Sequence, residues 1–483
     1  MLDRVAEKCG VFGIYAPGEE VARIAFFGLF ALQHRGQESA GIAVSDGREI
    51  RMHKAMGLVG QVFNEENLSP LKGFLAVGHN RYSTTGASAS VNAQPIRAEC
   101  ELGPFALAHN GNLVNCDRLR ERLEERGKYL VAITSDTQLI AFMIAEAKGS
   151  SWEEKIERAL PELAGAYSLV IGTPDKLIGI QDPLGVRPLC LGSFNGGWVI
   201  ASESCALATI GASFLREIEP GETVVIDEGG IRSFKREAKE LAFCLFEYVY
   251  LARPDSLLKG RYIYSVRQEI GRQLAREYPV EADFVMPIPD TAITAAIGYA
   301  EEAELPFVEG VIKNRYIQRT FIQPSQRLRD LGVRLKLNPL PEVLGGKRVV
   351  VVDDSIVRGT TTGPTVGLLK EAGAKEIHLR ICCPPYAHPC YLGINVATYE
   401  ELIAHHMTIE EIRGHVGADT LGYLSLDRLI AASGRPRSEL CTGCFTGRYP
   451  RAIIEAADES IKEKICGPAR ELCRVRSGGE VSR

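Results

Sequence analysis

The sequence of 483 residues lacks the features that would direct it to a membrane or a nucleic acid. No stretch approaches the roughly 18 uncharged apolar residues that a membrane span requires. The first eight residues carry no apolar core of the kind found in secretory signals. The formal net charge is only −5, which gives no electrostatic reason to expect a nucleic acid or an anionic membrane. We therefore expect neither kind of partner.

Low-complexity linkers are missing as well, which favours domains packed together over domains tethered loosely. The length allows two or more domains, each with its own core. Hydrophobic content of 45% and charged content of 24% are ordinary for a globular protein. Thirteen cysteines form an odd and scattered set, and no secretory signal precedes them. This usage predicts a reducing cytoplasm, with thiols serving chemistry or metal binding.

The most informative stretch is Val349–Thr362. Its four consecutive valines predict a strand buried on both faces of a parallel sheet. Asp353 and Asp354 follow the valines, at the sheet edge where open α/β folds bind ligands. Residues 358–362 then form a small-residue loop before a predicted helix, an arrangement that offers backbone N–H groups to a phosphate. Adjacent carboxylates accept hydrogen bonds from a sugar diol or bind Mg²⁺. The alternative is a buried strand that merely ends in two acids.

The full run resembles the phosphoribosylpyrophosphate (PRPP) signature of type I phosphoribosyltransferases. The resemblance implies an α/β domain in which Asp353 and Asp354 hold the ribose hydroxyls and contact Mg²⁺. It also implies a cradle for the 5-phosphate, formed by Arg358, Gly359, Thr360 and Thr361.

Two further segments fit the same resemblance. Strands and helices are predicted to alternate over residues 284–381, as a parallel sheet demands. A turn follows the first of these strands, and the resemblance implies that Asp290 contacts the pyrophosphate and Thr291 contacts Mg²⁺. Residues 313–330 carry five basic residues against one acid, which usually marks a solvated face. Here the resemblance implies a loop that closes over PRPP, with Lys313 and Arg315 as contacts.

The N-terminal half contains a second group of motifs. Cys9 precedes a short predicted strand and, alone, would be an ordinary core cysteine. Residues 78–86 close a strand with a polar cluster, and Asn110-Gly111 between apolar runs predicts a tight hairpin turn. Residues 134–137 open an apolar helix that runs to about residue 147. Together these motifs resemble the glutaminase domain of the N-terminal-nucleophile (class II) glutamine amidotransferases.

This second resemblance implies a catalytic thiol at the start of the mature chain. Cys9 would attack the side-chain amide of glutamine, with its own α-amino group as the general base. An internal peptide nitrogen is not a base, so residues 1–8 would be a propeptide that is removed. Asn110 and the N–H of Gly111 would form the oxyanion hole.

The same resemblance assigns the charged groups that bind glutamine. Arg81 would pair with the α-carboxylate, and Asp136 would hold the α-ammonium group. A surface ion pair or a helix cap is the alternative role for these two residues. The implied fold is an α+β αββα sandwich over residues 9–235, followed by the α/β type I phosphoribosyltransferase domain over residues 236–483.

Cys441 and Cys444 are spaced to share one metal, which spacing alone leaves open between zinc and an iron–sulfur cluster. Cys244 and Cys390 are candidates to complete four ligands. Spacing does not exclude four other cysteines, namely Cys382, Cys383, Cys466 and Cys473. The surrounding residues of the first four resemble the cluster-bearing glutamine PRPP amidotransferases. That resemblance implies a structural [4Fe–4S] cluster bound by Cys244, Cys390, Cys441 and Cys444.

Both halves thus resemble one family, the glutamine PRPP amidotransferases. The resemblance implies that glutamine and PRPP are the substrates and that 5-phosphoribosylamine, glutamate and pyrophosphate are the products. It also implies purine nucleotides as feedback inhibitors and a homotetramer. Two alternatives remain: a class II amidotransferase of the glucosamine-phosphate synthase type, which has no use for the Asp353-Asp354 loop, and a catalytically silent PRPP-sensing regulator.

Overall fold

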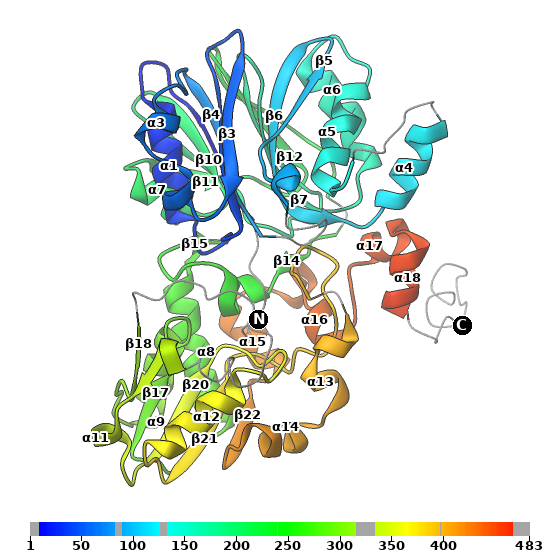
Figure 1. The fold of residues 1–483 in the computed structure, drawn as a ribbon. Coiled ribbons are helices and arrows are strands. Elements are labelled where there is room, and N and C mark those ends of the chain that lie inside the picture. Colours follow the sequence, from blue (N-terminus) through cyan, green and yellow to red (C-terminus); the bar gives the residue numbers. More distant parts are fainter. Residues whose placement is uncertain are drawn as a thin grey trace, which may run out of the picture. The chain divides into compact units, whose positions relative to one another are not determined.

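The computed structural model describes residues 9–82, 89–125, 133–238, 240–314, 334–396 and 398–466, which form two compact units (Figure 1). The C-terminal unit contains Cys244–Cys390 and Val396–Thr446. The N-terminal unit contains the described residues from Cys9 to Phe243, together with Tyr391–Asn395 and the described residues from Gly447 to Cys466. The domain boundary between residues 235 and 236 stays a prediction. Nothing in the sequence indicates that the two later segments belong to the N-terminal unit.

Two antiparallel sheets form the N-terminal unit (Figure 1). The seven-stranded sheet has the order β11-β9-β10-β1-β4-β2-β3, and the six-stranded sheet has the order β13-β12-β8-β7-β6-β5. The strands are β1 (Gly10–Tyr15), β2 (Ser39–Ser45), β3 (Ile50–Met56), β4 (Leu75–Arg81), β5 (Ile96–Cys100), β6 (Gly103–Leu113), β7 (Gly165–Gly172), β8 (Leu177–Gln181), β9 (Cys190–Phe194), β10 (Gly197–Ala201), β11 (Ser213–Glu217), β12 (Glu222–Asp227) and β13 (Gly230–Lys235).

Helices cover the outer faces of both sheets, and an apolar layer lies between the sheets. Val11 of β1 and Val170 of β7 belong to this inner layer. Leu29 and Leu207 pack against the seven-stranded sheet, and Ile156 packs against the six-stranded sheet. The helices of this unit are α1 (Val21–Ala31), α2 (Val59–Val62), α3 (Glu65–Leu68), α4 (Cys116–Glu125), α5 (Asp136–Glu146), α6 (Trp152–Ala159), α7 (Ser204–Thr209), α17 (Arg451–Ala456) and α18 (Glu459–Cys466). The predicted αββα sandwich is confirmed.

The C-terminal unit is built on a four-stranded parallel sheet of order β17-β20-β21-β22. Its strands are β17 (Phe284–Pro287), β20 (Arg348–Asp353), β21 (Glu376–Ile381) and β22 (Thr420–Tyr423). Val349–Val352 are at most 1% exposed, as a central parallel strand requires. The sequence prediction of an α/β domain with this buried strand is confirmed.

Helices and shorter strands complete the C-terminal unit. The helices are α8 (Ile263–Glu277), α9 (Ile293–Ala303), α11 (Pro341–Leu344), α12 (Thr362–Glu371), α13 (Ile403–His406), α14 (Ile409–Val416), α15 (Leu426–Ser433) and α16 (Gly443–Thr446). The shorter strands are β14 (Phe243–Cys244), β15 (Leu257–Leu258), β16 (Arg261–Tyr262), β18 (Val311–Lys313), β19 (Leu337–Pro339) and β23 (Leu440–Cys441). Helix α12 forms where the sequence predicts a helix, and it stops before Gly373, whose φ of +96° suits glycine.

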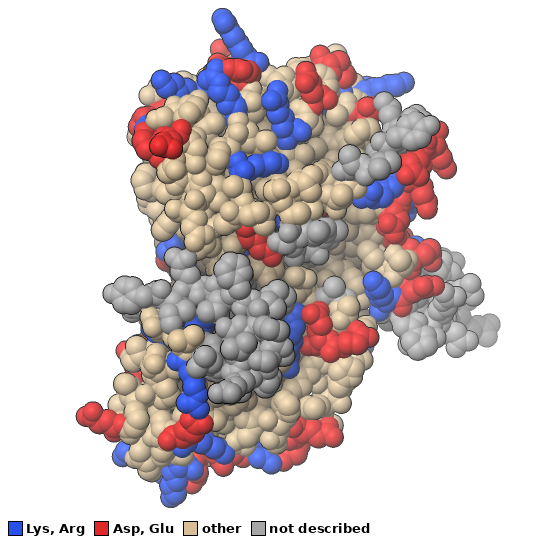
Figure 2. Space-filling view, in the orientation of Figure 1, with Lys and Arg blue, Asp and Glu red and all other residues tan. Residues whose placement is uncertain are grey.

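Charged side chains of both signs are interspersed over the face shown in Figure 2. Within the described part of the chain, no helix combines the length and apolar character needed to cross a membrane.

Candidate active sites

Cys9 lies directly before β1, a central strand of the seven-stranded sheet. Gly10 pairs with Asn80 of β4, so the chain brings Cys9 alongside Arg81. The Cys9 Sγ donates a weak hydrogen bond to the carbonyl oxygen of Tyr82 at 3.5 Å. Burial raises the pKa of the Cys9 thiol to about 11, against the lowering effects of this hydrogen bond and of the Arg81 charge. The thiol is therefore protonated near pH 7 and needs a base before it can act as a nucleophile.

The predicted hairpin turn at Asn110-Gly111 is wrong, because both residues lie inside strand β6. They pair with Ser168 and Tyr167 of β7. The glycine is needed for close approach: Gly111 has a φ of +155°, and a Cβ atom there would lie 1.9 Å from the carbonyl oxygen of Ala166. An Asn-Gly pair in a sequence can mark a hairpin turn or a strand position where another backbone comes close. Only the tertiary contact distinguishes the two cases.

Two hydrogen-bond donors at this place are available to a ligand. The buried Asn110 Nδ2 has no hydrogen-bond partner among the residues that the structure describes. Tyr167, opposite Gly111, directs both its N–H and its carbonyl group to Asp182, so β7 does not use the Gly111 N–H. An unused buried donor costs about 1–3 kcal/mol, which is typical of a site built for a bound acceptor.

Asp136 begins helix α5 but is not its cap. Ser135 is the N-cap, and its side chain accepts from the backbone N–H of Gln138. The buried Asp136 carboxylate accepts a hydrogen bond from the Leu113 N–H at 3.3 Å and lies 3.7 Å from Nδ1 of His109. Asp136 is therefore held between α5 and the end of β6, beside the two donors.

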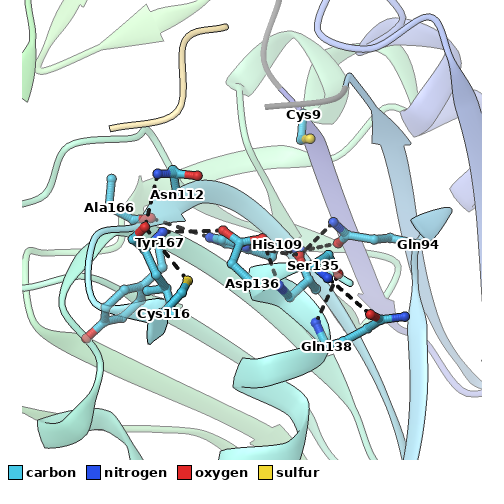
Figure 3. A network of polar contacts seen from close by, with 12 residues as sticks. Cys9, Gln94, His109, Asn112, Cys116, Ser135, Asp136, Gln138, Ala166 and Tyr167 are labelled. Atoms are coloured by element: carbon cyan, nitrogen blue, oxygen red, sulfur yellow. Dashed lines mark hydrogen bonds and ion pairs between the residues drawn. The ribbon is translucent and has the colours of Figure 1, made fainter. Parts of the chain in front are cut away.

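A network of buried polar side chains supports Asp136 (Figure 3). The His109 Nδ1 lies 3.2 Å from Oγ1 of Thr137, and the backbone N–H of His109 donates to Oε1 of Gln94 at 2.8 Å. Gln94 in turn donates to Oγ1 of Thr137 at 2.9 Å. Burial lowers the pKa of His109, so the ring is neutral near pH 7. No sequence motif marks Gln94, His109 or Thr137 for this role, because the role depends on contacts between segments that are distant in the chain.

The acidic pair of the C-terminal unit lies at the carboxyl end of β20. Asp353 accepts from the backbone N–H of Asp354 at 2.9 Å, and Asp354 Oδ1 accepts from the Ser355 hydroxyl at 2.8 Å. The second oxygen, Asp354 Oδ2, is buried without a hydrogen-bond partner in the described part of the chain. A buried carboxylate oxygen left in this state is suited to accept hydrogen bonds from a ligand.

The loop after the acidic pair has a defined shape. Gly359 has a φ of +73°, and a Cβ atom there would lie 2.6 Å from Cδ1 of Ile403. Thr360 continues the loop, and Thr361 is the N-cap residue of α12. Arg358 donates to the carboxylate of Glu401 at 2.6 Å. The loop thus ends at the helix N-terminus, where the helix dipole favours an anion.

The turn that follows β17 lies beside the acidic pair. Pro287 pairs with Val352 in the parallel sheet, so both strands end at the same edge. Asp290 forms an ion pair with Lys313, and Thr291 is half-buried before α9. Arg315 lies outside the described residues, as does most of the basic segment.

The other three predicted cluster ligands lie close to Cys444. Cys444 is buried, and burial raises its pKa, with a further rise from the neighbouring thiols of Cys244, Cys441, Cys390 and Cys383. These thiols come from distant parts of the chain. In the described residues no set of three or more His, Cys, Asp or Glu side chains is already arranged to hold a metal ion. The donor set fits an all-thiolate group, although the side chains do not have ligating geometry.

Comparison with known proteins decides the family. A family described as "Glutamine amidotransferase domain" matches residues 79–209, and one described as "Phosphoribosyl transferase domain" matches residues 255–393. The amidophosphoribosyltransferase of Synechococcus elongatus is 52% identical over 95% of this chain and 94% of its own. The enzyme of Methanocaldococcus jannaschii is 49% identical over 92% of this chain and 98% of its own.

The chain belongs to the amidophosphoribosyltransferase family. A solved glutamine PRPP amidotransferase from B. subtilis, complexed with ADP and GMP, has a TM-score of 0.87 and 46% identity, covering 93% of this chain and 99% of its own. The protein is accordingly a glutamine-dependent glycosyltransferase of purine biosynthesis. The alternatives of a glucosamine-phosphate synthase type and of a silent regulator are excluded by this membership.

Proposed function

We propose that Cys9 hydrolyses glutamine within the N-terminal unit, with Arg81 and Asp136 binding the two charged ends of the amino acid. The observation that carries this assignment is electrostatic: the charges of both Arg81 and Asp136 act on the Cys9 thiol. One cation and one anion near the same nucleophile match the α-carboxylate and α-ammonium groups of glutamine. Asn110 Nδ2 and the Gly111 N–H supply donors for the oxyanion.

The proposed reaction begins with a proton transfer from the Cys9 thiol to its own α-amino group. Sulfur then attacks the side-chain carbonyl carbon, and the oxygen takes negative charge between Asn110 and Gly111. The C–N bond breaks as the α-ammonium group of Cys9 gives this proton to the leaving nitrogen. Ammonia is released, and a glutamyl thioester remains on Cys9. Water hydrolyses the thioester to glutamate and restores the thiol.

In the C-terminal unit, ammonia displaces pyrophosphate from C1 of PRPP. We propose that Asp353 and Asp354 accept hydrogen bonds from the ribose diol and that residues 358–361 bind the 5-phosphate through N–H and hydroxyl groups. Asp290, Lys313 and Arg315 would lie toward the pyrophosphate. Mg²⁺, when bound at the acidic pair and Thr291, would neutralise charge on the leaving pyrophosphate.

The assignment requires that the mature protein begin at Cys9. Residues 1–8 lie outside the described residues, and with them attached the nitrogen of Cys9 is an amide. We expect the intact mass of fully glutamine-dependent enzyme to equal that of the chain from Cys9 to its end. Fully active enzyme whose mass includes Met1 would contradict the proposal, whereas ammonia-dependent activity is expected from either form.

For the thiols we propose a [4Fe–4S] cluster held by Cys244, Cys390, Cys441 and Cys444. The clustering of these side chains around Cys444 supports the ligand set. Such a group would cross-link distant segments and stabilise the fold. We expect the ultraviolet–visible spectrum of anaerobically purified protein to show a broad absorption band in the visible region. The protein should contain about four iron and four sulfide ions per chain. Stoichiometric zinc in place of iron and sulfide would contradict the cluster.

Three further properties are proposed from the relatives and the composition. The solved B. subtilis relative is complexed with ADP and GMP, which supports purine nucleotides as feedback inhibitors of this chain. We also propose a homotetramer. We propose a cytoplasmic location as well, because thirteen scattered cysteines are typical of a protein in a reducing compartment.

A further inference from the structure

A five-residue loop, Tyr391–Asn395, belongs to the N-terminal unit although the chain on both sides of it belongs to the C-terminal unit. We call it the 391–395 loop. Its base is closed by a hydrogen bond from the Cys390 N–H to the Val396 carbonyl oxygen at 2.9 Å. Leu392 and Ile394 are buried, so the loop is packed into its surroundings. A short loop packed in this way holds its backbone in one conformation.

The tip of the 391–395 loop lies directly on Gly111. A Cβ atom at Gly393 would come within 3.0 Å of the Gly111 carbonyl carbon and 3.2 Å of its Cα. On another side, a Cβ atom at Gly111 would meet the Ala166 carbonyl oxygen at 1.9 Å. Gly111 is thus confined between Ala166 of β7 and Gly393. The contact with Gly393 falls on the Cα and carbonyl group of Gly111, so a shift at Gly393 would move the Cα to which the Gly111 N–H is joined.

Two side chains hold the loop against the sheet. Arg187 is fully buried, and its guanidinium donates to the Leu392 carbonyl oxygen through Nε at 3.0 Å and also through Nη2. Asn112, the residue after Gly111, donates from Nδ2 to the Tyr391 carbonyl oxygen at 3.0 Å. Hydrogen bonds from a charged donor are about twice as strong as neutral ones. A buried cation therefore fixes the loop one residue before Gly393.

We propose that the 391–395 loop, clamped by Arg187, is a positioning element of the oxyanion hole that sets the direction of the Gly111 N–H. Arg187 and Gly393 touch neither glutamine nor Cys9 in this account, and they act through Gly111. The inference rests on the proposed oxyanion role of Asn110 and Gly111. It predicts that glutamine hydrolysis depends on a segment that is remote from the N-terminal motifs in sequence.

The test is Gly393→Ala in the full-length processed enzyme. The added methyl group must displace Gly111 or the loop, and we expect kcat for glutamine hydrolysis to fall by about 10- to 100-fold with KM changed less than about threefold. Ammonia-dependent product formation is expected to stay within about twofold of the parent. Affinity for an aldehyde analogue of glutamine, which forms a hemithioacetal on Cys9 and places an oxyanion in the hole, should fall by the same factor as kcat.

Gly196→Ala is the matched control, because Gly196 also has a positive φ of +81° but a Cβ atom there meets nothing within 4 Å. Arg187→Lys and Arg187→Met provide a second pair of variants. Because lysine retains a charged donor, we expect kcat to fall less in Arg187→Lys than in Arg187→Met. A kcat for Gly393→Ala equal to that of Gly196→Ala, or a loss confined to KM, would overturn the positioning role. Asn110→Ala separates the two proposals, since an unchanged kcat there would overturn the oxyanion assignment itself.

Discussion

Glutamine-dependent formation of phosphoribosylamine by the Cys9→Ala protein is expected to fall by more than about a thousandfold, while its ammonia-dependent rate stays within about twofold of the parent. The thiol is the only atom that we propose to become covalently bonded to glutamine, and removing a nucleophile typically costs this much or more. Added ammonia bypasses the step, because the C-terminal unit displaces pyrophosphate without help from Cys9. Pyrophosphate release from PRPP measures both rates.

Cys100→Ala is a suitable control for this experiment. Cys100 lies in the same unit, at the end of β5, and its thiol contacts only the nearby Gly103 carbonyl group among the hydrogen bonds of the described residues. We expect both activities to survive this substitution. Loss of glutamine use in Cys100→Ala, or its retention in Cys9→Ala, would contradict the assignment of the nucleophile.

The second large effect is expected for Asp354→Asn, which should lower kcat/KM for PRPP by about 10²- to 10³-fold with either glutamine or ammonia. The substitution preserves the shape of the side chain but replaces one buried carboxylate oxygen with an amide group. Hydrogen bonds to a charged acceptor contribute about 1.5–3 kcal/mol each, and the diol would lose up to two of them. Steady-state pyrophosphate release at varied PRPP is the measurement, with glutamate formation in the absence of PRPP as a check that the other site is intact.

Asp427→Asn gives the matched control in the same unit. The Asp427 side chain is 90% exposed and lies in an ion pair of 3.4 Å with Arg437, so the same chemical change should leave kcat/KM for PRPP unaltered. Equal kinetics in Asp354→Asn and Asp427→Asn would contradict a role for the acidic pair in binding PRPP.

Much of the fold could be predicted because local patterns agreed with it. The run Val349–Val352 has no polar alternation, and it forms the buried strand β20 as expected. Ser151 and Glu154 have the spacing of a capping box, and the Ser151 side chain accepts from the Glu154 N–H at the start of α6. Each of these signals acts over a few residues, so no knowledge of distant contacts was needed.

The parts that could not be predicted depend on tertiary contacts. Asn110-Gly111 has the sequence of a turn but lies in a long strand, since Ala166 leaves no room for a side chain at Gly111. Tyr391–Asn395 carries no signal that would assign it to the N-terminal unit. Arg187 has no distinguishing neighbours in sequence, yet it is fully buried against the Leu392 carbonyl group. The motifs located the reacting groups, whereas the groups that position them required the structure.

We infer that the N-terminal unit makes ammonia from glutamine and that the C-terminal unit consumes it at PRPP. The most direct measurement compares Cys9→Ala and Asp354→Asn side by side, each supplied with PRPP and either glutamine or ammonia. We expect the first variant to use ammonia alone. The second should use neither source well but still form glutamate from glutamine. A folded Cys9→Ala protein that fails with ammonia as completely as with glutamine would contradict this inference.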